Sequence, residues 1–211
     1  MYKRQPLALG KISLKVALFY ALILCFVAFI VLINFNLFTI ILALGSMPLA
    51  FTYPLMKRYT YWPQLFLGIT FNYGLILGWT SFTEQISLIP LIFYLGAIFW
   101  TLGYDTIYGY QDIKDDEIIG LKSTSIKFKK NPKIFLFICY LVFILSFIVG
   151  GYLLNFSFMY FLFLVLPIIH LFGFQIRSFN SEYPEKCLNI FKSNNFFGFI
   201  VLSIILIEKL L

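Results

Sequence analysis

The sequence predicts an all-α membrane protein built as a single polytopic helix bundle. Hydrophobic residues make up 61% of the 211 residues and charged residues only 12%, whereas a soluble domain carries about a quarter charged residues. Long apolar segments recur along the chain, and basic residues gather in alternate connections between them. No stretch long enough for a separate soluble domain remains, so we expect one transmembrane domain over residues 1–211.

Seven apolar segments are each near the length of roughly 20 residues that an α-helix needs to cross a bilayer. Their bounds are predicted at about 16–33, 37–54, 65–82, 87–104, 134–153, 158–176 and 195–210.

The basic residues predict the orientation of this bundle. Fifteen of the sixteen Lys and Arg residues lie before the first segment or in alternate connections, and Lys209 is the exception. The positive-inside rule places that face in the cytoplasm, with the N-terminus inside and the C-terminus outside. The net charge of +7 is therefore read as contact with the membrane surface rather than with nucleic acid, and a bacterial inner membrane is the expected location.

Several isolated residues favour packing over chemistry. The three cysteines, Cys25, Cys139 and Cys187, are far apart in sequence and form no CxxC, so neither a disulfide nor a zinc site is expected. The only histidine, His170, lies in an apolar segment and is expected to pack. Gly74 and Gly78 form a GxxxG pattern, which predicts close packing against a neighbouring helix.

One polar run stands out between two apolar blocks, at residues 103–117. Five of the nine acidic residues fall within these fifteen positions. If the run continues the preceding helix, Asp105, Asp112 and Asp116 lie within roughly 40° of one another, with Tyr108 at the edge of that face. Stacked carboxylates repel unless a cation lies between them, and Mg²⁺ is commonly held by carboxylates together with substrate phosphates. A solvated acidic loop is the alternative, and the spacing alone does not decide between them.

Two further polar clusters are predicted to lie on the same side of the membrane. One spans residues 53–65 and contains Lys57 and Arg58; the other spans residues 120–124 and contains Lys122 beside two hydroxyls. Acids and basic residues together suit a diphosphate with Mg²⁺, and the membrane setting favours a diphosphate attached to a lipid. For Lys57 and Arg58 an ordinary positive-inside anchor is an equal alternative.

These clusters carry a resemblance to a known family. Tyr104-Asp105-Thr106-x-Tyr108, Asp112-x-x-Asp115-Asp116 and Gly120-x-Lys122-Ser123-Thr124 resemble the second aspartate-rich motif of the 4-hydroxybenzoate polyprenyltransferases, in the UbiA superfamily. Tyr53-Pro54-x-x-Lys57-Arg58-x-Thr60-x-x-Pro63-Gln64 resembles a cytoplasmic loop of the same enzymes. Pro184-Glu185-x-Cys187, with Phe191, Asn194, Asn195 and Gly198, resembles their last-helix signature.

The resemblance implies a nine-helix fold and an activity in ubiquinone synthesis, transfer of a polyprenyl group from polyprenyl diphosphate to 4-hydroxybenzoate within the membrane. By the match, Asp112 and Asp116 bind the Mg²⁺–diphosphate, and Asp105 supports them. Lys57, Arg58 and Lys122 contact phosphate oxygens or the carboxylate of the aromatic acid, and Tyr108 is assigned to substrate binding.

The sequence departs from the family pattern at its start. The family's first aspartate-rich motif precedes an Arg-Pro-Leu-x-x-Gly-x-Ile-Ser stretch, which here is matched by residues 5–13 with Gln5 in place of Arg. We therefore expect a domain that lacks the first two helices and the first motif, and that binds Mg²⁺–diphosphate weakly alone. A separately encoded N-terminal fragment is one predicted partner; a non-catalytic remnant is the alternative.

Two other classes of function remain open. A transporter predicts charged residues near the bilayer midplane and often an internal repeat, whereas the acids here cluster at one face and no repeat is evident. A membrane scaffold without catalysis predicts that replacing Asp112 and Asp116 by alanine changes nothing.

Overall fold

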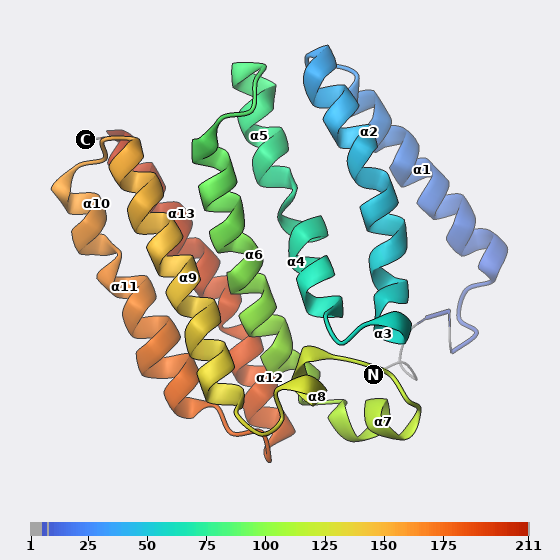
Figure 1. The fold of residues 1–211 in the computed structure, drawn as a ribbon. Helices are drawn as coiled ribbons and strands as arrows, with labels where there is room; N and C mark the ends of the chain where they lie inside the picture. Colours follow the sequence, from blue (N-terminus) through green and yellow to red (C-terminus); the bar gives the residue numbers. More distant parts are fainter. Residues whose placement is uncertain (1–5, 8, 211) are drawn as a thin grey trace. The chain divides into compact units, whose positions relative to one another are not determined.

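The computed structural model describes residues 6–7 and 9–210, which form helices joined by short connections (Figure 1). Seven helical segments in this part are long and apolar enough to cross a membrane: Leu14–Leu32, Leu37–Tyr59, Pro63–Thr83, Leu88–Gly109, Pro132–Leu153, Phe158–Ile176 and Pro184–Leu210. The all-α class and the seven predicted spans are confirmed.

Three of the spans extend at least five residues beyond their predicted ends because the helix continues into polar sequence. The second ends at Tyr59 rather than at 54. The fourth ends at Gly109 rather than at 104, so Asp105 lies inside it. The seventh begins at Pro184 rather than at 195, because α12 (Pro184–Lys192) carries Glu185, Lys186 and Lys192 and was too polar to register as apolar.

The chain divides into two compact units, one up to Gly45 and one from Ser46. The first unit holds α1 (Leu14–Leu32) and most of α2 (Leu37–Thr52). The Ser13 side chain accepts a hydrogen bond from the Val16 amide at the start of α1. The Asn36 side chain accepts one from the Thr39 amide, at 2.8 Å. Such caps satisfy amides that the first turn of a helix leaves unpaired.

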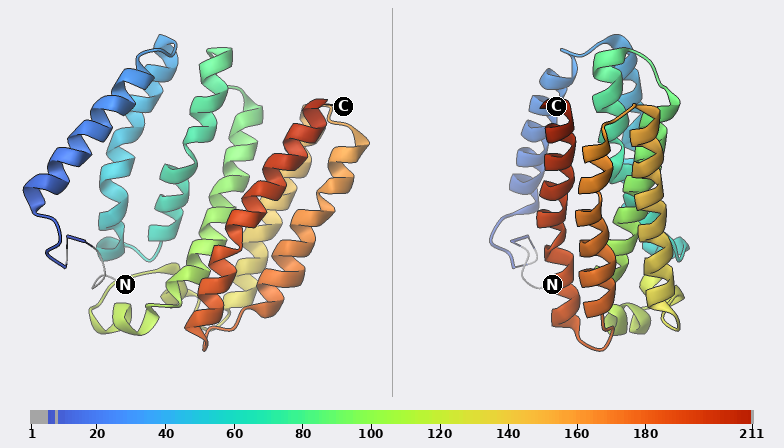
Figure 2. Two further views of the ribbon diagram at one scale, coloured as in Figure 1. Left: turned by 180° about the vertical axis from the view of Figure 1, so that it is seen from behind. Right: turned by 90° about the vertical axis from the view of Figure 1, so that its left-hand side faces the viewer.

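The second unit contains the rest of α2 and the remaining helices. These are η2 (Tyr53–Leu55), α3 (Met56–Tyr59), α4 (Pro63–Asn72), α5 (Gly74–Thr83), α6 (Leu88–Gly109), α7 (Ile113–Ile118), α8 (Thr124–Lys127), α9 (Pro132–Leu153), α10 (Phe158–Phe163), α11 (Val165–Ile168), η3 (Ile169–Ile176), α12 and α13 (Asn194–Leu210). Helix α6, green in Figures 1 and 2, packs against α4, α9 and α12. The short helices α3, α7 and α8 lie at the end of this unit where α6 finishes.

Close contact between α6 and α9 depends on small residues. A Cβ added at Gly103 would lie 2.5 Å from the Tyr140 ring, and one added at Gly96 would lie 2.9 Å from Ser146 Cβ. Small residues let membrane helices approach closely and gain van der Waals contact. Among the described residues, a Cβ added at Gly74 or Gly78 would meet no atom within 4 Å, so close packing at this GxxxG pattern stays a prediction.

A buried hydrogen-bonded network joins four helices within the second unit. The Tyr140 hydroxyl donates to Gln175 Oε1. Asn194 Oδ1 accepts from Gln175 Nε2 and from the Trp100 indole N–H, both at 3.0 Å. Gln175 lies in η3, a π-helical segment, and Asn194 begins α13. Because unpaired polar groups are costly in an apolar interior, this network specifies how α6, α9, η3 and α13 fit together.

His170 lies beside this network and packs against an aromatic ring. Its ring centroid is 5.5 Å from that of Phe197, and its Nε2 lies 3.2 Å from Ser193 Oγ.

Candidate active site

The acidic run is not one continuous helix. Helix α6 ends at Gly109, a turn follows, and α7 begins at Ile113. At this bend Tyr110 and Ile113 bury their side chains, at 2% and 8% exposure, and Tyr110 packs 5.2 Å from the Phe179 ring. The assumption that Asp105, Asp112 and Asp116 share one helical face is therefore wrong.

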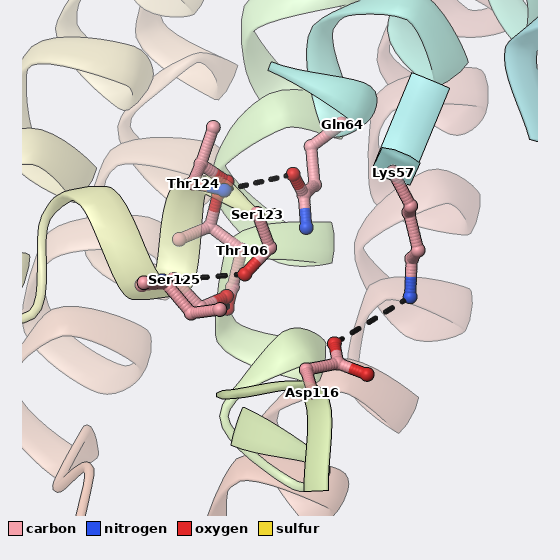
Figure 3. A network of polar contacts seen from close by, with 8 residues as sticks. Lys57, Gln64, Thr106, Asp116, Ser123, Thr124 and Ser125 are labelled. Carbon is pink, nitrogen blue, oxygen red and sulfur yellow. Dashed lines mark hydrogen bonds and ion pairs between the residues drawn. The ribbon is translucent and has the colours of Figure 1, made fainter. Parts of the chain in front are cut away.

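Despite the bend, Asp105 and Asp116 both lie within reach of the charge of Lys57. Lys57 Nζ lies 3.8 Å from Asp116 Oδ2 (Figure 3). The charge of Lys57 also acts on Asp105, and that of Asp112 acts on Asp116. The charges of Asp105 and Asp112 both reach the Tyr108 hydroxyl. We call these five residues, Lys57, Asp105, Tyr108, Asp112 and Asp116, the acid–lysine cluster.

Asp116 is a buried acid of the acid–lysine cluster, at 7% exposure. Burial raises the pKa of this carboxyl, the positive charge of Lys57 opposes that rise, and Asp112 and Asp115 add to it. A buried carboxylate flanked by two others is stabilised by any further cation that comes close. The electrostatics of this position therefore favour cation binding.

The donor set fits a divalent ion that is shared with a substrate. Within residues 6–7 and 9–210, no three His, Cys, Asp or Glu side chains are grouped closely enough to hold a metal ion alone. Mg²⁺ is usually bound by one or two protein carboxylates together with substrate phosphates and water. Asp112 and Asp116 would supply two carboxylates of that kind, and a diphosphate would supply the remaining oxygens.

Two predicted substrate-binding residues lie beside the acid–lysine cluster rather than within it. Arg58 is exposed at the end of α3. Lys122 donates from Nζ to the Tyr59 carbonyl at 3.2 Å and lies 5.7 Å from the centre of the Tyr61 ring. Contact of either residue with a substrate stays a prediction.

The third predicted motif also reaches this site. The Phe191 ring, near the end of α12, lies 4.5 Å from the Tyr108 ring and 5.7 Å from the Tyr104 ring. The two tyrosine rings lie on the same stretch of α6 as Asp105. Three segments far apart in sequence therefore converge, at Lys57, at the end of α6, and at Phe191.

Sequence reasoning gave no role to a set of polar side chains beneath the acid–lysine cluster. They are almost fully buried where α4, α6 and α8 meet: Gln64, Thr106, Ser123, Thr124 and Ser125 (Figure 3). Most of them fall within the motifs quoted above. The signal that could have found them is the presence of uncharged polar residues at the helix ends next to the charged positions.

The fold and the site define the class of protein, a polytopic helical membrane protein with acids and a lysine gathered at one end of its bundle. The UbiA prenyltransferase family profile matches residues 2–201. The chain belongs to the UbiA prenyltransferase family.

Individual relatives agree with this assignment. The chain is 38% identical to 4-hydroxybenzoate geranyltransferase 2 of Lithospermum erythrorhizon, over 99% of this chain and 68% of that protein. It is 37% identical to the mitochondrial 4-hydroxybenzoate polyprenyltransferase of Drosophila melanogaster, over 98% of this chain and 53% of that protein. The apo structure of a UbiA homolog from Aeropyrum pernix K1 superimposes with a TM-score of 0.80 at 23% identity, over 98% of this chain and 77% of that one. The last comparison confirms the fold.

Proposed function

We propose that this chain transfers a polyprenyl group from polyprenyl diphosphate to the ring of 4-hydroxybenzoate, a step of ubiquinone synthesis. Family membership and the names of the relatives support the reaction class. The observation that supports the proposal is the acid–lysine cluster, in which Lys57 lies 3.8 Å from Asp116 and Asp112 acts on the same carboxyl, since a cation beside two carboxylates suits a Mg²⁺–diphosphate. We further propose a bacterial inner membrane as the location, with this site on the cytoplasmic side.

The proposed reaction breaks one bond and forms another. The bond between C1 of the prenyl group and the diphosphate oxygen breaks, and the diphosphate leaves with the electron pair. The ring carbon ortho to the hydroxyl forms a bond to C1 and then loses its proton, which restores the aromatic ring. A divalent ion bound with the diphosphate would neutralise the negative charge on the leaving group.

The chain's own residues would assist both halves of this reaction. Lys57 would stabilise negative charge on the departing diphosphate. The rings of Tyr104, Tyr108 and Phe191 lie together at the end of α6, and aromatic faces attract a cation. Apolar surroundings would keep water from the allylic cation.

Residue roles follow from this proposal. Asp112 and Asp116 would hold Mg²⁺ with the diphosphate, and Asp105 would support them. Arg58 and Lys122 would contact phosphate oxygens or the carboxylate of the aromatic acid. A first aspartate-rich motif, in the same or a separate polypeptide, would complete the site, and this requirement stays a prediction.

The test measures Mg²⁺-dependent prenyl transfer to 4-hydroxybenzoate in membranes that contain this chain, alone or with a first-motif fragment. Activity only with the fragment, lost in Asp112→Ala, would support a two-part site. Activity of the chain alone would show that the second motif suffices. No activity in either preparation, with the protein shown to be inserted, would contradict the proposed function.

Lys57→Met is expected to lower transfer at subsaturating polyprenyl diphosphate by about 10- to 100-fold, the value of one hydrogen bond to a charged group. The reason is that Lys57 lies beside Asp116, where its ammonium group would bond to the charged diphosphate. The KM for the diphosphate should rise, while the KM for 4-hydroxybenzoate should change little. Lys130→Met, at an exposed position before α9, is the control for lost surface charge. An equal loss in both variants would mean that Lys57 acts only as a membrane anchor.

A further inference from the structure

The buried polar residues beneath the acid–lysine cluster are bonded mainly to one another. The Thr106 hydroxyl donates to the Leu102 carbonyl at 2.6 Å. Its oxygen lies 2.6 Å from the Thr124 hydroxyl, so Thr124 is the donor of that second bond. Gln64 Oε1 accepts from the Thr124 amide at 3.0 Å (Figure 3). We call the contact between α4, α6 and α8 made by Gln64, Thr106 and Thr124 the threonine–glutamine clasp.

The clasp is tightly fitted against the end of α6. Ser125 Oγ donates to the Thr106 carbonyl at 2.8 Å. A Cβ added at Gly109 would overlap Ser125 Oγ and would lie 3.5 Å from Gln64 Nε2. Gln64 and Thr124 are 3% and 0% exposed. Because unpaired polar groups are costly at such burial, these hydrogen bonds strongly restrict the relative placement of the three helices.

A short series of backbone bonds connects the clasp to both charged partners. The Leu121 amide donates to the Asp116 carbonyl at 2.9 Å, and the Lys122 amide donates to the Lys57 carbonyl at 2.8 Å. Because residues 121 and 122 lead directly into Thr124, these two bonds link the clasp to the backbone of Asp116 and to the backbone of Lys57. The backbone of Lys57 is in this way tied to the backbone that carries Asp116.

The Lys57–Asp116 ion pair does not hold these segments by itself. Its N–O distance is 3.8 Å, and the Lys57 side chain is 45% exposed, so the pair is screened by solvent. The Trp62 ring packs 5.6 Å from Phe128 and 6.3 Å from Phe135. This apolar contact also joins the segment that carries Lys57 to the segment that carries Asp116. Apolar contact is non-directional, so it does not fix Lys57 in register with Asp116 as hydrogen bonds do.

We propose that Gln64 and Thr124 are positioning residues, which hold Lys57 and Asp116 at the spacing needed to bind one diphosphate together with its metal ion. The proposal deepens the proposed function and rests on it for the identity of the ligand. Gln64 and Thr124 act through the backbone of the two segments and do not contact the substrate.

The first experiment measures the spacing of the two segments without any ligand. Spin labels are placed at Tyr59→Cys and Ile118→Cys, two positions that are 71% and 82% exposed. Cys25 is replaced by serine because it is exposed, whereas Cys139 and Cys187 are buried and are kept. Thr124→Val and Gln64→Leu are expected to broaden the distance distribution. Thr124→Ser, which keeps the hydroxyl, should restore it. Unchanged distributions in both Thr124→Val and Gln64→Leu would overturn the proposal.

The second experiment measures binding of inorganic diphosphate with Mg²⁺ to the purified full chain by calorimetry. Thr124→Val and Gln64→Leu are expected to raise the apparent Kd by about tenfold or more, the usual cost of removing a residue that orients metal ligands. Thr124→Ser should stay near the wild type. The control is Thr80→Val, which removes a fully buried hydroxyl on α5 and should leave the Kd unchanged.

The outcomes separate this proposal from the proposed function. Equal Kd values in wild type, Thr124→Val and Gln64→Leu would overturn the positioning role, whatever the reaction is. Weaker binding in those variants from a wild type that binds diphosphate but prenylates no 4-hydroxybenzoate would support positioning and contradict the proposed acceptor. No binding by the wild type, either alone or with the first-motif fragment, would overturn both.

Discussion

Replacing Asp116 by asparagine is expected to lower Mg²⁺-dependent prenyl transfer by about 10²- to 10³-fold, the loss typical when a preorganised electrostatic contact is removed from an active site. Asparagine keeps the shape of the side chain and removes its charge. The backbone turn should survive, because the Asp116 amide donates to the Asp112 carbonyl and the Asp116 carbonyl accepts from the Leu121 amide. The measurement is initial rate as a function of Mg²⁺ concentration, together with the thermal midpoint of the purified protein.

Asp115→Asn is the matched control for this variant. Asp115 is the adjacent acid of the same motif, but its side chain is exposed whereas that of Asp116 is buried and paired with Lys57. The control should retain activity within about threefold, since exposed charges interact weakly through water. Equal losses would show that the net negative charge of α7 matters rather than the position of Asp116. An unchanged rate in Asp116→Asn would remove this residue from the metal site.

Apolar segment length predicted the seven spans, because a span's length is set by the thickness of the bilayer and its composition by the absence of water. The predictions were less accurate where a helix runs on into polar sequence. Asp105 was expected beyond the end of a span and lies within α6. Helix α12 was missed as part of the last span because one of its faces is polar. Composition detects burial in lipid, not the continuation of a helix beyond it.

Two of the predicted site residues, Lys57 and Asp116, are neighbours in the structure, and the roles of all the predicted site residues stay predictions. The single helical face assumed for the acids was wrong. Charge spacing assumed a continuous helix, whereas the chain bends after Gly109 and returns at Ile113. At the bend, Tyr110 packs against the ring of Phe179, a residue far along the chain, and a one-dimensional pattern does not contain such contacts. The same limit applies to Gln64, whose partner, the Thr124 amide, lies 60 residues further along the chain.

The packing of α6 on α9 provides the second large expected effect. Gly103→Ala is expected to lower the free energy of unfolding by about 1–3 kcal/mol, the usual cost of overpacking a core. The new methyl group would lie 2.5 Å from the ring of Tyr140. That ring is fully buried and its hydroxyl is bonded to Gln175, so it cannot move aside without disturbing the network at Asn194. The measurement is the thermal midpoint in detergent, with Gly78→Ala as control, since a Cβ there meets no atom within 4 Å.

A double variant identifies the cause of this loss. Tyr140→Phe removes the hydroxyl that holds the ring at Gln175, so Gly103→Ala should cost less in the Tyr140→Phe background than in the wild type. Because Gly103 precedes Asp105 by two residues on the same helix, the single variant should also reduce prenyl transfer, and the double variant should recover part of it. Strict additivity of the two changes would mean that the methyl group is accommodated by movement of the α6 backbone, independently of the Tyr140 hydroxyl.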